Sequence, residues 1–595
     1  MRGISRRSFV KLAGTVTGGV ALAGVTGCSA NAAGTASDAS AADVVYVNAS
    51  VYTENDNAPE AEAFAVKDGA FVYVGAADDK ELEALKGANT KVVDLSGKMV
   101  TPNLIDAHTH PGTVGTTKWC TEIDGSTVEE FVEKIGDYCK EHSATDAPYV
   151  YFKAYPSDLF GDSGPTKELL DAVTDRPVLV TDFNDHSAWV NTSWLETYGA
   201  YDMDKDDARL NGFVRTQSGD FQGWLKELGW SDYMEAFYER LGWRPPIDCT
   251  PELMSWVTDD LKSWGVTGCF DAYIESDQQM ESIHQMDVDG KLNMYYDLSV
   301  KLGSYDELDD AIERVKRLNK TYGTDHVRMD TIKIFYDGTN ELGTSALVDG
   351  TEQDPDYHGE VFMDYDQTKQ TIRKGNENGV DLHFHLVGDL AFRLICNAVE
   401  EITNEDGALD IQVEMCHCEY INPADRERPA ELGIIINWTP QWSGGYFGEA
   451  ARTYLGDARF DDMYQFNPTI ASGAIVTFGS DIYSWDEEGR ANPYFGMQTA
   501  MTRVDIEQPL SSNNGVRLPE SAKLSLEDLL RGYTINAAKQ LRFDDVTGSI
   551  EVGKGANFNV YGENLFDVDP TKFKDVMPEA VVFEGNVISG ELKDV

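Results

Sequence analysis

Two histidines placed two positions apart constrain this chain more than any other feature. His108 and His110 follow the apolar pair Leu104 and Ile105. In an extended strand, side chains two positions apart point to the same face, so both imidazoles can reach one ion. Imidazole suits zinc and similar metals, but two ligands do not complete a site. The pair indicates either part of a metal site or two ordinary strand-end histidines, and residues at later strand ends must decide between them.

The composition allows a large folded body. The chain has 595 residues, of which 42% are hydrophobic and 11% aromatic. This length is too great for one small core, and an α/β barrel with accessory modules fits it. The formal net charge is −53 and the pI is about 4.4. Nucleic acids and anionic membrane surfaces would repel such a body, so we expect neither as a partner.

Short apolar runs alternate with helix-like segments through most of the chain. The helix-like segments include residues 365–378 and 391–403, and such alternation calls for a parallel sheet. Eight strands are expected, which predicts an α/β fold of the (β/α)8 barrel type. The expected strands are residues 104–110, 265–272, 292–300, 328–336, 380–386, 411–418, 434–438 and 475–478.

Four further residues with metal-binding or catalytic chemistry close these runs, namely Lys333, His385, His417 and Asp481. Barrel enzymes keep their chemistry at these carboxyl ends of the strands. His385 and His417 are about one βα unit of roughly 30 residues apart, and Asp481 follows about two units later. The residues therefore fall on strands 5, 6 and 8, with Lys333 on strand 4. His383 shares a strand face with His385, so either could be a ligand.

Residues 101–112 resemble the metal-binding first barrel strand of the amidohydrolase superfamily, usually Pro-Gly-Phe-Ile-Asp-x-His-x-His. Asn103 stands where the family usually has Gly, and Asn tolerates left-handed backbone better than most residues. The order of the strand-end residues is also that of the superfamily, whose His-x-x-Gly-Asp pattern selects His385. The resemblance implies a metal-ligand set of His108, His110, Lys333, His385, His417 and Asp481.

The implied cofactor is one or two divalent ions, with zinc as the expected metal. Such an ion lowers the pKa of a water towards about 7. We expect Asp481 to remove a proton as the water attacks the substrate carbonyl, and to pass it later to the leaving amine. We expect His417 and the metal to stabilise the oxyanion.

The role of Lys333 has two alternatives. An ammonium group pointing at a divalent cation is repelled, whereas reaction with carbon dioxide gives an anionic carbamate. The matching strand-4 lysine bridges two ions in this way in many binuclear amidohydrolases, and we favour this role. The alternative is a protonated Lys333 that is paired with an acid such as Asp337 at a site holding one metal.

The resemblance implies hydrolysis of a non-peptide C–N bond in a small amide, of the N-acyl or N-formyl kind. The same metal centre also supports hydrolysis of esters, lactones or cyclic amides, because fold and metal do not fix the substrate. A different alternative is a substrate-binding lipoprotein that has lost catalysis, and the intact ligand set argues against it.

A long segment separates barrel strands 1 and 2. Residues 111–255 far exceed the roughly 30 residues of a βα unit, which indicates an inserted module. Within it, residues 185–192 and 211–223 resemble the YtcJ-like or N-substituted formamide deformylase-like subfamily. His186 and Trp189 either form a wall of the substrate pocket or pack within the insertion.

Three aromatic residues follow barrel strand 7. Trp438, Trp442 and Tyr446 either pack an apolar acyl or amine group of the substrate or fill a loop. Trp442 is the candidate that we assign to substrate binding.

The two ends of the main body read as antiparallel strands. Residues 43–100 and 545–595 contain short apolar runs between Gly, Asn and Asp turns, and we expect them to pair in one β-sandwich. Amidohydrolases have such a sandwich, and residues 552–557 resemble the family's Gly-Lys-x-Ala-Asp stretch. The barrel then spans residues 101–544.

The N-terminus resembles a signal. Residues 5–11, Ser-Arg-Arg-Ser-Phe-Val-Lys, precede an apolar run that is too short and Gly-rich for an ordinary membrane span. They closely resemble a twin-arginine signal, and the sequence that ends at Cys28 resembles a lipobox, whose cysteine is lipidated. We expect residues 1–28 to be this signal and residues 29–42 a flexible tether. The protein would then be exported and lipid-anchored at the outer face of the cell membrane.

Overall fold

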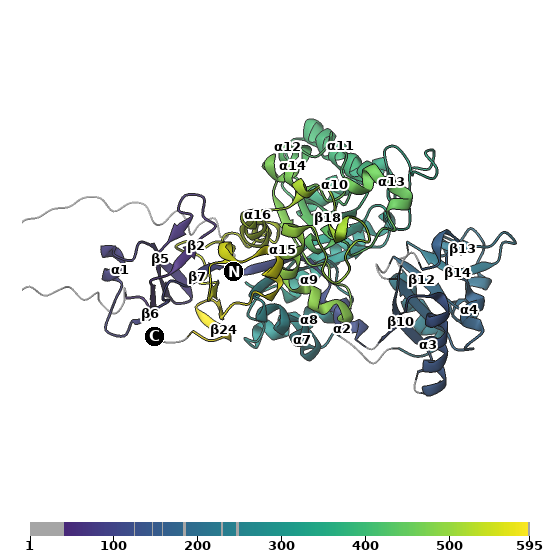
Figure 1. Cartoon of the computed structure of the whole chain (residues 1–595), viewed down its shortest axis with the longest axis horizontal. Coiled ribbons are helices and arrows are strands. Elements are labelled where there is room, and N and C mark those ends of the chain that lie inside the picture. Colours follow the sequence, from purple (N-terminus) through teal and green to yellow (C-terminus); the bar gives the residue numbers. More distant parts are fainter. Residues whose placement is uncertain are drawn as a thin grey trace, which may run out of the picture.

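The computed structural model describes residues 41–592, except 119, 124, 146, 157–158, 183–185, 228–229 and 245–248. The expected signal, Cys28 and nearly all of the expected tether lie outside the described residues. Figure 1 shows three parts in a row, with a β-sandwich at the left, a barrel in the middle and an inserted module at the right. None of the helices in the described part of the chain is both long and apolar enough to cross a membrane.

The barrel is an eight-stranded sheet whose strands follow one another in chain order. All of the pairings recorded within it are parallel, and most strand residues are buried, as expected for strands covered on both faces. Its strands are β8 (Leu104–Thr109), β15 (Val266–Asp271), β16 (Tyr295–Leu302), β17 (Val327–Phe335), β18 (Asp381–Leu386), β19 (Val413–His417), β20 (Ile435–Trp438) and β21 (Val476–Phe478).

Backbone hydrogen bonds just beyond β21 close the barrel against β8. The Asp481 amide donates to the His108 carbonyl over 2.8 Å, and the His110 amide donates to the Ile482 carbonyl over 3.1 Å. These bonds bring the first and last strand ends together, and both of those ends carry candidate metal ligands.

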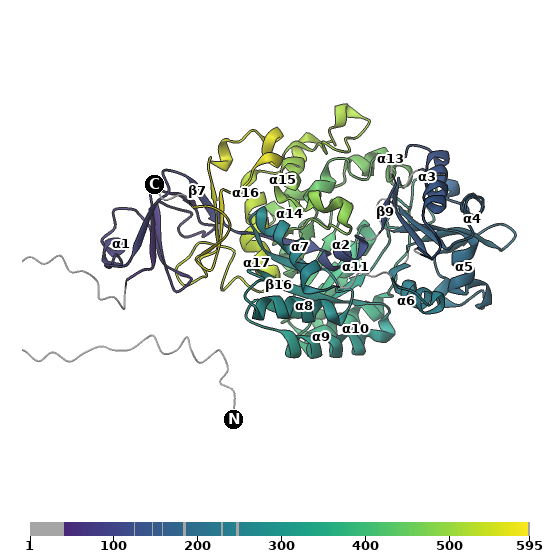
Figure 2. The same ribbon diagram turned by 90° about the horizontal axis from the view of Figure 1, so that it is seen from below.

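Amphipathic helices cover the outside of the barrel. In α9 the buried residues, from Leu308 to Leu318, recur every three or four positions, which gives the helix one apolar face for the sheet. Figure 2 shows α8, α9 and α10 next to one another along this surface. The main outer helices are α7 (Pro251–Ser263), α8 (Asp277–Val288), α9 (Leu308–Tyr322), α10 (Tyr365–Asn378), α11 (Asp389–Asp406), α12 (Arg428–Leu432), α14 (Phe466–Ala471), α15 (Pro493–Thr502) and α16 (Leu526–Arg531).

The (β/α)8 fold predicted from the sequence is therefore confirmed. The expected helix at residues 365–378 coincides with α10. The third strand differs, because β16 begins at Tyr295 and not at residue 292. Asn293 adopts a left-handed conformation with φ +51°, which interrupts an extended chain just before the strand.

The inserted module has its own six-stranded sheet, in the order β13-β14-β12-β11-β10-β9. Its core is rich in aromatic residues, among them Trp194, Phe237 and Tyr149. The strands are β9 (Thr121–Glu122), β10 (Val150–Tyr155), β11 (Val178–Asp182), β12 (Ser187–Val190), β13 (Phe213–Arg215) and β14 (Phe221–Lys226). The helices are α3 (Val128–Glu141), α4 (Lys167–Asp171), α5 (Thr192–Tyr198) and α6 (Trp230–Leu241).

Both chain ends build the sandwich. Its two sheets have the orders β5-β4-β1-β6 and β24-β23-β22-β7-β2-β3, and they share a core that includes Phe64 and Phe558. The strands are β1 (Val44–Val47), β2 (Ser50–Tyr52), β3 (Glu60–Ala61), β4 (Ala63–Lys67), β5 (Ala70–Gly75), β6 (Lys91–Asp94), β7 (Met99–Pro102), β22 (Phe558–Tyr561), β23 (Ala580–Phe583) and β24 (Asn586–Gly590).

Two features of the sandwich differ from expectation. β1 pairs with β6, and β2 with β7, in parallel, because in each case a longer connection returns the chain to the same end of the sheet. Asn103 does not have a left-handed backbone; its side-chain amide donates to the Val582 carbonyl over 2.8 Å and so ties the first barrel strand to β23. A glycine could not make this bond.

Candidate metal centre

The carboxyl ends of β8, β17, β18, β19 and β21 bring the expected ligands to one end of the barrel. Asp481 lies at their centre. Its Oδ1 is 3.3 Å from His108 Nε2 and 3.2 Å from His110 Nε2, and its Oδ2 is 3.3 Å from His417 Nδ1. His385 lies beside His417, with 4.5 Å between the ring centroids.

The backbone is bent at two of these residues. His417 has φ +71° and Asp481 has φ +50°, in a region that non-glycine residues seldom adopt. Each such conformation costs of order 1–3 kcal/mol and persists when the surrounding structure imposes it. The bends come where each chain leaves its strand, at the residue whose side chain enters the site.

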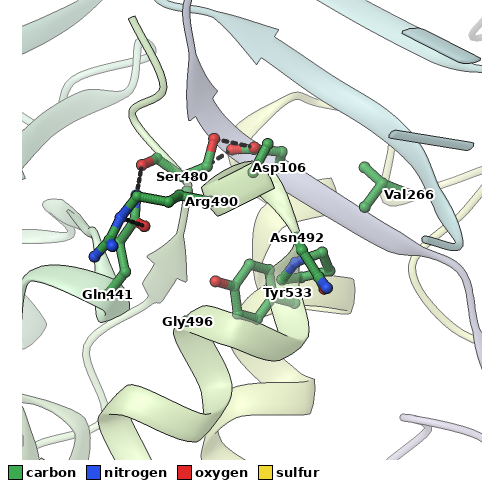
Figure 3. Close-up of a pocket in the computed structure, with 11 residues that line it drawn as sticks. Asp106, Val266, Gln441, Ser480, Arg490, Asn492, Gly496 and Tyr533 are labelled. Carbon is green, nitrogen blue, oxygen red and sulfur yellow. Dashed lines mark hydrogen bonds between the residues drawn. The ribbon is translucent and has the colours of Figure 1, made fainter. Parts of the chain in front are cut away.

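A polar network holds the Asp481 loop from behind, around the small cavity in Figure 3. Asp106 accepts hydrogen bonds from the Ser480 amide over 2.9 Å and the Ser480 hydroxyl over 2.6 Å. Gln441 donates to the Ser480 carbonyl over 2.5 Å, and Arg490 donates to Gln441 over 3.1 Å. These hydrogen bonds hold the loop at Ser480 through its backbone amide, its hydroxyl and its backbone carbonyl.

His383 supports the site from one layer deeper. Its Nε2 is 2.9 Å from His108 Nδ1, and its Nδ1 is 2.6 Å from the Glu414 carboxylate. A chain of carboxylate, imidazole and ligand imidazole of this kind fixes the orientation and tautomer of the ligand. His385, in contrast, lies against His417 with its Nε2 buried and without a hydrogen-bond donor or acceptor among the described residues.

The protonation states suit a cation. Burial lowers the pKa of His108 to about 3, with a further contribution from the Lys333 charge, and burial also lowers the pKa values of His110, His385 and His417. Burial alone would raise the pKa of Asp481, but the neighbouring His108 and His417 outweigh it and hold that pKa well below its usual range. At neutral pH the histidines are neutral and Asp481 is ionised, which are the forms that bind metals.

The donor geometry fits a divalent metal ion. Ligand atoms of His108, His417 and Asp481 lie within 4.8 Å of one another. Within the described chain, His110 Nδ1, His385 Nε2 and His417 Nδ1 are buried without a hydrogen-bond partner. Nitrogen and oxygen ligands in such a set are typical of zinc and similar ions.

Lys333 reaches the same centre. Its Nζ is 3.1 Å from His108 Nε2 and 3.4 Å from Cys416 Sγ, and the residue is almost completely buried. Asp337, the acid considered as its partner, instead accepts hydrogen bonds from the amides of Ala346, Val387 and Gly388. The Asp337 carboxylate therefore joins the loop after β17 to the residues that follow β18.

The insertion contributes His186 to the barrel's open end. The His186 ring centroid is 5.2 Å from that of His385, and its Nδ1 is 2.9 Å from a Glu227 carboxylate oxygen. The expectation for Trp189 is wrong. That side chain is fully buried in the insertion's own core, where it donates to the Thr166 carbonyl and packs on Phe160, so the packing alternative applies.

Of the three aromatic residues at the end of β20 and beyond it, Trp442 lies at the site. Its ring stacks on His417, with centroids 5.2 Å apart and an interplanar angle of 21°. Trp438 is buried, where it stacks on Phe466 and donates to the Cys418 carbonyl. Tyr446 bonds to Glu487. Trp442 thus lies at the candidate centre, whereas the other two make their contacts outside it.

Several residues around the centre were not expected from the sequence. Tyr273 and Tyr483 flank His110, at centroid distances of 4.8 and 5.2 Å, and their hydroxyls are 2.7 Å apart. Lys301, near the end of β16, lies over the Tyr273 ring. Tyr273 comes two residues after β15, and Lys301 lies within an apolar run, so their positions at strand ends were the available signals.

The chain is similar in sequence to known proteins over most of its length. The chain is 24% identical to an N-substituted formamide deformylase of Arthrobacter pascens, over 88% of this chain and 94% of that protein. It is 23% identical to the putative amidohydrolase YtcJ of Bacillus subtilis, over 90% of this chain and 98% of that protein.

Two solved structures share the fold. One is a metal-dependent hydrolase of Pyrococcus horikoshii, with a TM-score of 0.63 at 19% identity, covering 92% of this chain and 100% of that one. The other is an atrazine chlorohydrolase of Arthrobacter aurescens, with a TM-score of 0.51 at 14% identity, covering 93% and 96%. The amidohydrolase family model matches residues 91–589, which include the barrel, the insertion and part of the sandwich, and the chain therefore belongs to the amidohydrolase family.

Proposed function

We propose that this amidohydrolase is a zinc-dependent enzyme that hydrolyses a non-peptide C–N bond in a small amide of the N-acyl or N-formyl kind. The observation that carries the proposal is the Asp481 carboxylate, whose oxygens lie within 3.2–3.3 Å of three histidine ring nitrogens. The 24% identity with an N-substituted formamide deformylase supports the choice of bond.

His108, His110, His385, His417 and Asp481 would hold the metal. When bound, a divalent ion lowers the pKa of water and polarises the substrate carbonyl. Asp481 is ionised and so can accept the proton that the attacking water loses. The same carboxyl group can then donate that proton to the leaving amine. His417, which stacks on Trp442, would stabilise negative charge on the carbonyl oxygen.

We further propose that Lys333 is carboxylated in the active enzyme. An ammonium group this close to His108 opposes a second positive charge, whereas a carbamate would add two anionic oxygens to the ligand set. The observation in favour is that the Asp337 carboxylate, the alternative counter-charge, is already used by three backbone amides.

The test is metal analysis of purified protein together with a panel of N-formyl and N-acyl amines. We expect about one or two zinc ions per chain, turnover of at least one amide, loss of turnover after chelation and its return with zinc. Metal binding should also raise the melting temperature, because the ion binds only the folded state. Protein that binds no divalent metal under these conditions would refute the proposal.

A further inference from the structure

A buried arginine joins three segments beside the metal centre. Arg490 follows β21 and is only 7% exposed. Its Nε donates a hydrogen bond to Gln441 Oε1 over 3.1 Å, and its two terminal nitrogens donate to the carboxylates of Asp505 and Glu507. Gln441 lies in the loop after β20, whereas the two acids lie in the segment after α15. The guanidinium therefore connects both of these segments to its own.

Gln441 carries the link to the metal centre. The residue is 1% exposed, and its side-chain amide, which accepts from the guanidinium, donates to the Ser480 carbonyl over 2.5 Å (Figure 3). Ser480 precedes Asp481, whose backbone has φ +50°. Trp442, the next residue after Gln441, stacks on the His417 ring. One side chain therefore connects the loop that carries Trp442 with the loop that carries Asp481.

The segment after α15 packs closely on the Trp442 loop. A Cβ at Gly444 would clash with the amide nitrogen of Asp505, and a Cβ at Gly445 would lie 2.5 Å from a carbonyl oxygen of the same segment. The fully buried Asp505 carboxylate accepts hydrogen bonds from the amides two and three positions later and so shapes this turn. The acid that pairs with Arg490 therefore also holds the Trp442 loop from outside.

The Arg490 guanidinium has little freedom to move. It lies over the rings of Tyr446 and Phe495, at 4.3 and 4.5 Å from their centroids. A buried ion pair adds little net stability relative to apolar residues of equal volume, but its hydrogen bonds are directional. Arg490 is therefore suited to fixing the position of Gln441.

We propose that Gln441 and Arg490 are positioning residues that hold Asp481 and Trp442 in one fixed arrangement at the metal centre. Groups that take part in a reaction must be held within about 0.5 Å of their productive positions, and loops do this less precisely than strands unless other residues support them. The inference rests on the proposed hydrolase function, in which Asp481 is the base and Trp442 contacts the substrate.

The test replaces Gln441 by Met, which keeps the length of the side chain but cannot donate a hydrogen bond to the Ser480 carbonyl. We expect the zinc affinity of Gln441→Met to fall by at least about tenfold, as the loss of a contact behind a metal ligand typically causes. The visible absorption spectrum of the cobalt-substituted protein should shift, because that spectrum reports the geometry of the ligands. Gln278→Met makes the same exchange at an exposed position of α8 and should match the parent in both measurements.

Arg490→Lys is a second variant, which keeps the positive charge next to Asp505. A single ammonium cannot reproduce the planar fork that holds Gln441 and both acids, so we expect changes in the same direction. On a verified amide, both variants should lower kcat by at least about tenfold and also raise KM, because Asp481 and Trp442 shift together. A change in only one of the two constants would overturn the joint role.

Hydrogen exchange measures the coupling without metal or substrate. In Gln441→Met, the backbone amides of residues 439–443 and of residues 479–482 should both exchange at least about tenfold faster than in the parent, as expected for the loss of a buried hydrogen bond. The insertion sheet should keep the parent rates, which would show that the variant is folded. Parent-like rates at residues 479–482 in either folded variant would overturn the proposal. If the parent hydrolyses no amide but both segments respond in this way, the positioning role stands and the proposed reaction fails.

Discussion

At the scale of the residue, Asp481 combines two properties that oppose each other in most carboxylates, namely low exposure to solvent and a low pKa. Its side chain lies among histidines and is only 10% exposed, yet its pKa is held well below the usual range, because neighbouring His108 and His417 outweigh the effect of burial. A base in this position needs no proton removed before each turnover at neutral pH. It can therefore act both as a metal ligand and as the group that carries the proton from water to the leaving amine.

Replacing the carboxylate separates these roles. In Asp481→Asn the amide keeps an oxygen ligand and the shape of the side chain but cannot accept a proton. We expect kcat to fall by about 10²–10⁴, with metal content kept near that of the parent. Steady-state kinetics and metal analysis measure the two effects. Asp457→Asn, at a side chain that is 84% exposed, is the control and should behave as the parent. Parent-like turnover in Asp481→Asn would show that another group is the base.

Lys333 can be tested by chemical rescue. We expect Lys333→Ala to lose metal and activity, because the alanine supplies no oxygen to an ion. Acetate or propionate should restore part of both, since a free carboxylate can occupy the space left by the side chain. Growth with bicarbonate and excess zinc should raise the metal content of the parent. A crystal structure with unmodified Lys333 turned away from a single, fully occupied zinc in an active enzyme would exclude the carbamate.

At the scale of the element, the junction of β8 and β21 determines the geometry of the site. Gly479 follows β21, and a Cβ there would lie 2.5 Å from the His108 amide nitrogen and 2.6 Å from its carbonyl oxygen. These are backbone atoms of a buried strand, so they cannot move aside as a flexible side chain would. The absence of a side chain at Gly479 is what lets the strand ends approach.

We expect Gly479→Ala to lower the free energy of unfolding by about 1–3 kcal/mol, as overpacking typically does, and to weaken metal binding. Urea denaturation and zinc titration measure these effects. Gly489→Ala is a matched control, because a Cβ at Gly489 meets nothing within 4 Å. Equal stability and zinc affinity in the two variants would show that the junction of β8 and β21 can accommodate a side chain at Gly479.

Strand ends also explain which residues could be found from the sequence. His385 and His417 each close an apolar run, so a local pattern places them at the open end of the barrel. Glu227 has no such signal, because its position depends on a contact with Thr339, 112 residues away in the chain. Trp189 fails for a related reason: a motif in an inserted module does not show whether a side chain faces the barrel or the module's own core.

At the scale of the whole molecule, the site depends on more than the barrel. The insertion supplies His186 and Glu227 to the open end, while the sandwich lies at the opposite side of the barrel from the insertion (Figure 1). The formal charge of −53 surrounds this site with a negative field, which raises the local concentration of cations. A cationic substrate would gain in association rate from that field.

We propose that the protein is exported in its folded state and anchored through Cys28. Replacing both Arg6 and Arg7 by Lys should leave precursor in the cytoplasm, because the paired arginines are the signal that the export machinery reads. Cys28→Ala should abolish labelling by radioactive fatty acid, whereas Cys139→Ala should keep it. Cell fractionation and lipid labelling provide the measurements. A lipid label that persists on Cys28→Ala would exclude this anchor.

The pairing of β7 with β22 affects when the protein can finish folding. β7 leads into the first barrel strand, but its partner emerges from the ribosome only near the end of synthesis. At typical rates of about 5–20 residues per second, a chain of 595 residues takes about 30–120 s to complete. Until then the β7 edge lacks its partner, and the apolar sandwich face stays open to chaperones and proteases. A prematurely terminated chain, which lacks β22, therefore leaves that edge of β7 uncovered.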